Sequence, residues 1–127
     1  MRPLQYRYQW LFGGMCLIGL VLYMTLMPDV PGPTLLNDKL AHGIAFMALM
    51  VWFSGIIEMR FAPLVAVALL CLGVLIELAQ QQLSYRSAEL ADGLADMAGI
   101  VAGWSLAVIR LQHWAKWIES LIATDHS

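Results

Sequence analysis

The sequence predicts an all-α protein: a four-helix transmembrane bundle with both termini in the cytoplasm and a short interfacial helix at the C-terminal end. The first observation is composition, because 61% of the 127 residues are hydrophobic and only 13% are charged, whereas soluble domains carry roughly 25% charged residues. The second is that the apolar residues form four runs, each about long enough to cross the ~30 Å hydrocarbon core of a bilayer. The third is that the basic residues gather at one side of these runs.

The length limits the protein to one domain, residues 1–127, because four spans use most of the chain. A net charge of −2 is too small to indicate a nucleic-acid surface, so no nucleic-acid partner is expected. Cys16 and Cys71 both lie inside apolar runs. We expect them to act as small hydrophobic residues and not to form a disulfide.

The first run covers about residues 10–27. A basic segment precedes it, as in a cleavable signal peptide, but no small-x-small cleavage pattern follows it. We therefore expect a retained helix. Pro28, Pro31 and Pro33, together with Gly32, then break the helix.

The second run covers about residues 39–57, and Asn37 or Asp38 is expected to cap its N-terminus. A short turn leads to the third run, about residues 61–80. Pro63 suits the first turn of that helix, where a missing amide hydrogen costs nothing.

The fourth run covers about residues 88–110 and follows a polar connection. Beyond it, one helix face would carry Leu111, Trp114, Ile118 and Leu121, and another would carry Arg110, His113 and Lys116. This pattern is typical of a helix that lies in the membrane interface. A fourth helix that simply continues beyond the bilayer is the alternative.

The basic residues predict the orientation of the bundle. Five fall at one side of the four spans and two at the other: Arg2, Arg7, Arg60, Arg110 and Lys116 against Lys39 and Arg86. Cytoplasmic loops are enriched in Lys and Arg. Both termini are therefore expected in the cytoplasm, and the two longer connections are expected to face outward.

Small residues recur at every fourth position of the fourth run, namely Ala91, Ala95, Gly99, Gly103 and Ala107. Gly99 and Gly103 form a small-xxx-small pair, which lets two helix backbones approach closely in a membrane. We favour packing within the same bundle. A homodimer through the fourth helix is the alternative.

Polar residues gather at the outward end of the predicted bundle, although they come from different segments. They are Asp38, Lys39 and His42 of the second helix, Glu77, Gln80 and Gln81 of the third, Arg86 of the connection, and Asp92 and Asp96 of the fourth. Ionisable residues inside membrane helices are energetically expensive and commonly mark functional sites. We therefore expect these side chains to line one polar site.

Helical spacing predicts which of these residues share a face. Asp38 and His42 are four residues apart, as are Asp92 and Asp96, so each pair lies on one helix face. Arg86 is expected to fold over the bundle, with His42 lining the same cavity, because its planar fork can bridge two carboxylates. Its expected partners are Glu77, Asp92 or Asp96.

A divalent metal held by His42, Glu77, Asp92 and Asp96 is an alternative arrangement of the same groups. Neutralisation of the carboxylates by the two strong cations on that side is simpler. We therefore expect no metal and no cofactor.

The polar residues occur in an ordered pattern: Asp38-Lys39-x-x-His42, then Glu77-x-x-Gln80, then Arg86-x5-Asp92-x3-Asp96-x-x-Gly99. This pattern resembles the VanZ-like family of small bacterial membrane proteins, from about residue 29 to residue 107. The resemblance implies a multi-pass protein of the cell envelope in the bacterial cytoplasmic (inner) membrane. The founding member of the family is associated with teicoplanin resistance. The family usually has Asn at the position of Asp96, so this chain carries an extra ionisable group.

The function that we expect is binding of a lipid or lipid-linked envelope ligand. Lys39 and Arg86 would contact phosphate, and Gln80 and Gln81 would orient sugar or amide groups. The bilayer itself is the other expected partner.

Three alternatives remain open at the level of sequence. An enzyme would use His42 as a base oriented by Asp38, with acid–base or metal chemistry that also involves Glu77 and Asp96. A transporter would need a polar path to the opposite side, which the distribution of polar residues does not provide. A purely structural polar cluster would fix the loops of a scaffold protein.

Overall fold

The computed structural model describes residues 4–26, 35–83, 90–111 and 113–125, with the side chains of residues 35–38 and 110–111 outside the described part. Every regular element in these ranges is helical, so the all-α prediction is confirmed. The main helices are α1 (Arg7–Leu26), α2 (Leu35–Ile56), α3 (Ala62–Gln81), α4 (Leu90–Leu106) and α5 (Trp114–Asp125). A 3₁₀ turn, η1 (Met59–Phe61), precedes α3, and a π-helical turn, η2 (Ala107–Leu111), follows α4.

Among the described residues, four helical segments are long and apolar enough to cross a membrane: Arg7–Leu26, Lys39–Ile56, Met59–Gln81 and Leu90–Ile109. Their outer faces expose large apolar side chains, among them Phe12, Leu20, Leu64, Leu75 and Val101. A soluble monomer rarely leaves so much apolar surface uncovered. Four apolar helices are confirmed, and they suggest a multi-pass membrane protein.

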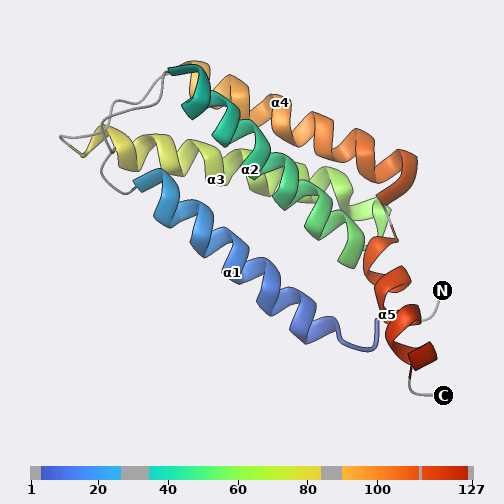
Figure 1. Cartoon of the computed structure of the whole chain (residues 1–127). Coiled ribbons are helices and arrows are strands. Elements are labelled where there is room, and N and C mark those ends of the chain that lie inside the picture. The colour runs from blue at the N-terminus through green and yellow to red at the C-terminus, as the bar shows by residue number, and fades with distance from the viewer. Residues whose placement is uncertain (1–3, 27–34, 84–89, 112, 126–127) are drawn as a thin grey trace.

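The helices form a bundle in which α2 is central (Figure 1). α2, α3 and α4 lie side by side, α1 lies along their flank, and α5 packs across the end at which α1 begins. The most extensive contact joins α2 to α4. These two helices run parallel, because Lys39 lies near Asp92 and Met47 lies near Gly103.

Glycines of α4 allow this close α2–α4 contact. A Cβ at Gly99 would overlap the carbonyl oxygen of Gly43, and a Cβ at Gly103 would lie 2.7 Å from the carbonyl oxygen of Met47. Both α4 glycines are buried. The small-residue face thus packs against α2 of the same chain, and a homodimer through this face would have to displace α2.

The apolar core lies around α2. Phe46, Leu49 and Met50 of α2 are fully buried, and Ile76 of α3 and Ile100 of α4 pack into the same cluster. Helices in lipid associate through close packing and not through hydrophobic burial. In this bundle, α2 is the helix against which the buried residues of α3 and α4 pack.

The start of α2 differs from the sequence prediction. The helix begins at Leu35, so Asn37 and Asp38 lie inside its first turn, and the prediction that one of them is the N-cap is wrong. Leu35 and Leu36 are strong helix formers that extend the helix upstream. In α3, by contrast, Pro63 occupies the expected position in the first turn.

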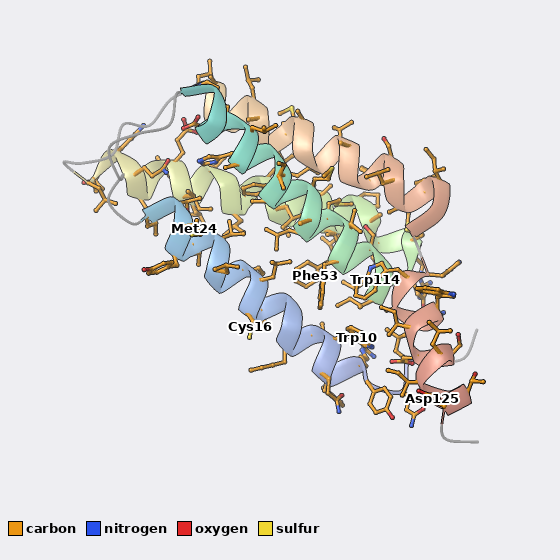
Figure 2. All side chains as sticks on the ribbon, viewed as in Figure 1. Trp10, Cys16, Met24, Phe53, Trp114 and Asp125 are labelled. Atoms are coloured by element: carbon orange, nitrogen blue, oxygen red, sulfur yellow. The ribbon has the colours of Figure 1, made fainter. Side chains whose placement is uncertain are left out.

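The C-terminal segment forms a separate helix and not a straight continuation of α4. The π-helical turn ends α4, and α5 starts again at Trp114. Such turns change the direction of a helix, which lets α5 pack across the bundle end. Cys16 and Cys71 are free and exposed, as expected for residues outside any disulfide. Figure 2 shows Cys16 pointing away from the other helices.

Candidate functional site

Four ionisable residues on α2 and α4 form two facing pairs, which we call the polar ladder. His42 Nδ1 lies 3.0 Å from Asp96 Oδ1, and Lys39 Nζ lies 3.7 Å from Asp92 Oδ1. The two α2 residues are three positions apart and the two α4 residues are four apart, so each pair occupies one face. Because the helices are parallel, the bases of α2 meet the carboxylates of α4 in register.

The polar ladder is graded in exposure. The side chains of His42 and Asp96 are only 4% and 5% exposed, Asp92 is 7% exposed, and Lys39 is 29% exposed. The ladder therefore has an accessible cation at its outer end and a sealed pair one helical turn deeper. Removing an ion from water costs several kcal/mol even after relaxation, so His42 and Asp96 depend on each other. Asp92, in the first turn of α4, is also favoured by the helix dipole.

Two glycines bring α3 against the ladder. Asp96 Oδ2 lies 3.0 Å from the point that a Cβ on Gly73 would occupy. Glu77 Oε2 lies 3.4 Å from the corresponding point on Gly93 of α4. The carboxylates of Asp96 and Glu77 thus lie in the seam between α3 and α4. A larger residue at Gly73 would push against the Asp96 carboxylate.

Glu77 differs from the four ladder residues. It is only partly buried, and within the described ranges its carboxylate makes no hydrogen bond or ion pair. The sequence led us to expect a polar role at this position. The structure places this acid beside the ladder, on the third helix of the bundle.

The partner found for His42 is not one that helix spacing suggested. Its Nδ1 contacts Asp96, which is 54 residues away, whereas spacing drew attention to Asp38 on the same helix. The side chain of Asp38 and the whole of Arg86 lie outside the described residues. The predicted pairing of Arg86 with Glu77, Asp92 or Asp96 therefore stays a prediction.

The glutamines of α3 do not join the ladder. Gln80 is 2% exposed, and its Nε2 donates a 2.9 Å hydrogen bond to the carbonyl of Thr25, at the end of α1. Gln81 is exposed. Gln80 thus ties α3 to α1, because the last carbonyls of a helix lack partners within it.

The metal alternative has no donor set in the described ranges, where no group of three or more His, Cys, Asp or Glu side chains could hold an ion. Each carboxylate of the ladder instead faces a nitrogen base.

A second constellation, at the opposite end of the bundle, was missed in the sequence. Trp10, Trp52 and Trp114 pack with ring centroids 4.9–5.9 Å apart, and we call this group the tryptophan cluster. Trp52 Nε1 donates to the Trp10 carbonyl at 3.1 Å, and Trp114 Nε1 donates to the Val51 carbonyl at 2.9 Å. Figure 2 shows Trp10, Phe53 and Trp114 gathered where α1, α2 and α5 meet. The cluster therefore joins three helices.

Glu119 of α5 completes this end of the molecule. Its carboxylate accepts hydrogen bonds from the backbone amides of Gln5 and Tyr6, at 2.8 and 2.9 Å, and from Trp10 Nε1 at 2.8 Å. Burial raises the pKa of Glu119, but these three hydrogen bonds favour the charged form and together hold the pKa below its ordinary value of 4.5. A carboxylate from one helix thus satisfies amides at the start of another.

A signal for this second constellation was present in the sequence. Trp10, Trp52 and Trp114 all lie near the same predicted side of the bundle, where tryptophans commonly gather at a membrane interface. Glu119 lies among the basic residues of that side. The contacts of Trp114 and Glu119 with the other helices depend on the turn between α4 and α5, and the sequence pattern did not predict the direction of that turn.

Comparison of the chain with protein-family models, with curated proteins and with solved structures finds no match.

Proposed function

We propose that this chain is a VanZ-like integral membrane protein of the bacterial cell envelope that binds the head group of a lipid or lipid-linked envelope ligand at its polar end. The observation that carries the proposal is the graded polar ladder. Lys39 is accessible at the outer end of the ladder, and the His42–Asp96 pair is buried one helical turn deeper. All four ionisable groups of the ladder lie inside two candidate spans.

The energetics favour a functional role for this ladder over a purely stabilising one. Replacing a buried ion pair by apolar residues of similar volume is often neutral or stabilising. Ionisable groups within membrane spans are rare and are typically tied to function. A head group at the outer end of α2 and α4 would meet the ammonium of Lys39 first. A phosphate is a suitable acceptor for that ammonium.

The orientation that we propose places both termini in the cytoplasm and the polar ladder on the outer side, in agreement with the excess of Arg and Lys at the terminal end. α5 would then lie in the cytoplasmic interface, since Trp117 and Leu121 are exposed on it. A cytoplasm-dependent fluorescent reporter fused after residue 127 is expected to be active. An active periplasmic phosphatase at the same position would overturn this orientation.

Native mass spectrometry of the gently purified full-length protein tests the binding proposal. The wild-type chain is expected to retain lipid or lipid-linked adducts from a total bacterial lipid extract. Lys39→Gln should reduce adduct retention about tenfold, as expected for the loss of roughly 1.4 kcal/mol of charge-assisted contact.

The matched control is Arg60→Gln, because Arg60 is an exposed cation at the other end of the bundle, where it pairs with the exposed Glu58. It should leave adduct retention unchanged. A wild-type protein that retains no lipid, or an equal loss for both variants, would contradict the proposal.

An acid–base enzyme is the second candidate, and the His42–Asp96 contact favours it. A carboxylate at Nδ1 fixes the imidazole and increases the basicity of the other ring nitrogen, as in a general base with its orienting acid. Incubation of the protein with the same lipid extract should then yield new lipid species. These species should be absent with His42→Gln. An unchanged lipid profile with the wild-type protein would contradict the enzymatic function.

A further inference from the structure

The charges of the described polar end do not balance, and the imbalance falls on one residue. Lys39 faces Asp92, and His42 faces Asp96, so each carboxylate of α4 has a nitrogen base on α2. Glu77 of α3 has no base within the described ranges. It nevertheless lies inside a candidate membrane span.

The position of Glu77 makes it reachable from the membrane. Its side chain is only partly buried, and its Oε2 lies 3.4 Å from the point that a Cβ on Gly93 would occupy, so the glycine leaves room for the carboxylate in the α3–α4 seam. One helical turn away on each helix, Val74 and Met97 are exposed apolar residues. The Glu77 carboxylate is thus the partly exposed polar group of this seam and is flanked by exposed apolar residues, whereas the Asp96 carboxylate in the same seam is buried.

An amphiphile matches this arrangement. Apolar side chains on both sides suit acyl chains, while an unpaired carboxylate is stabilised by a cation that also donates hydrogen bonds. A primary ammonium supplies both the charge and the donors. A quaternary ammonium supplies the charge without the donors, and a phosphate would be repelled.

We infer that Glu77 is the ligand-binding carboxylate of the polar end, and that it receives the primary ammonium of a membrane amphiphile in the seam between α3 and α4. This inference rests on the proposed lipid-binding function and specifies the chemistry of the head group. Lys39, at the outer end of the ladder, lies on the side from which the phosphate of the same head group would approach.

The test uses full-length protein in detergent micelles and native mass spectrometry with three separate probes: phosphatidylethanolamine, phosphatidylglycerol and free ethanolamine. Wild-type protein should bind phosphatidylethanolamine most tightly. Glu77→Gln, which keeps the size of the side chain, should weaken that binding about tenfold, the effect of losing one charge-assisted hydrogen bond. Binding of phosphatidylglycerol, which has no ammonium group, should not be weakened by this substitution.

The matched control is Glu58→Gln, which removes an exposed carboxylate at the other end of the bundle and should leave all three affinities unchanged. If free ethanolamine binds as tightly as the lipid and depends on Glu77 in the same way, the site binds a soluble amine. That result would overturn the inference that the ligand is an amphiphile. Equal binding of phosphatidylethanolamine by wild-type protein and Glu77→Gln would overturn the role of Glu77. Failure of the wild-type protein to bind either lipid would instead overturn the proposed function itself.

Discussion

The two ends of this bundle are built from different chemistry. At the polar end, the Lys39–Asp92 and His42–Asp96 contacts link α2 and α4 inside candidate membrane spans. At the other end, three tryptophans and Glu119 link α1, α2 and α5 through ring contacts and hydrogen bonds to the backbone.

The difference between the ends separates two roles. Aromatic packing and satisfied amides stabilise a structure directly. Buried ion pairs add little net stability, although breaking one is costly. The tryptophan cluster is therefore expected to hold the helices together. The polar ladder keeps ionisable groups in a place where stability alone would favour apolar residues.

The largest effect is expected from breaking the buried pair at the polar end. Asp96→Ala leaves His42 without its carboxylate and should lower the free energy of unfolding in detergent by about 3–5 kcal/mol. Asp96→Asn keeps an oxygen that accepts a hydrogen bond from Nδ1 and should cost much less. Chemical denaturation followed by circular dichroism measures both. Equal losses for the two variants would show that the hydrogen bond to Nδ1 contributes nothing beyond the charge of Asp96.

The next effect tests the tryptophan cluster. Trp114→Ala removes the ring that contacts both Trp10 and Trp52 and should cost about 3 kcal/mol, within the range for aromatic truncation in packed sites. Trp117 lies on the same helix but is 64% exposed, so Trp117→Ala should change stability by less than about 0.5 kcal/mol. Similar unfolding curves for the two variants would argue against a stabilising cluster.

A smaller effect comes from the glycine beneath the cluster. A Cβ at Gly55 would overlap the indole of Trp114, so Gly55→Ala should displace the ring and cost about 1–3 kcal/mol. Gly19 on α1 has nothing within 4 Å of the same position. Gly19→Ala should therefore stabilise the helix by about 0.5–1 kcal/mol. Thermal unfolding distinguishes the two, and the same sign for both would contradict the packing described.

The smallest effect concerns the protonation of Glu119. Because its pKa is lower in the folded protein, the stabilisation is fully present above its ordinary pKa of 4.5 and is lost as the pH falls through the lowered value. Wild-type protein should therefore be more stable than Glu119→Gln at pH 7. The difference should shrink below pH 4.5 and vanish in stronger acid. A difference that stays constant with pH would mean that the charge contributes nothing.

Part of this structure could be predicted from the sequence. Apolar runs define the four spans, because a bilayer requires about 20 apolar residues per helix. The repeat of small residues at Gly99 and Gly103 identifies the α4 face that packs closely. Helix ends were less predictable, since the start of α2 at Leu35 follows from helix propensity and not from the polar residues at Asn37 and Asp38.

The candidate site was predictable in composition but not in its contacts. An unusual set of ionisable residues identified the polar end, yet the partner of His42 depends on the register of α2 against α4, which no local pattern specifies. The contact of Gln80 could not be predicted either, because its hydrogen bond to the Thr25 carbonyl depends on where α1 ends. The contact of Glu119 with the amides before α1 likewise depends on how the chain turns between α4 and α5.

The central claim is that the polar end binds a ligand while the tryptophan cluster holds the fold. Its most direct test is native mass spectrometry of Glu77→Gln and Trp114→Ala, both kept below their unfolding temperatures, with lipid adducts counted per folded molecule. Trp114→Ala should retain adducts at the wild-type level despite its lower stability, whereas Glu77→Gln should retain about tenfold fewer while remaining the more stable of the two. Adduct loss that follows stability in both variants would contradict the division of roles between the two ends.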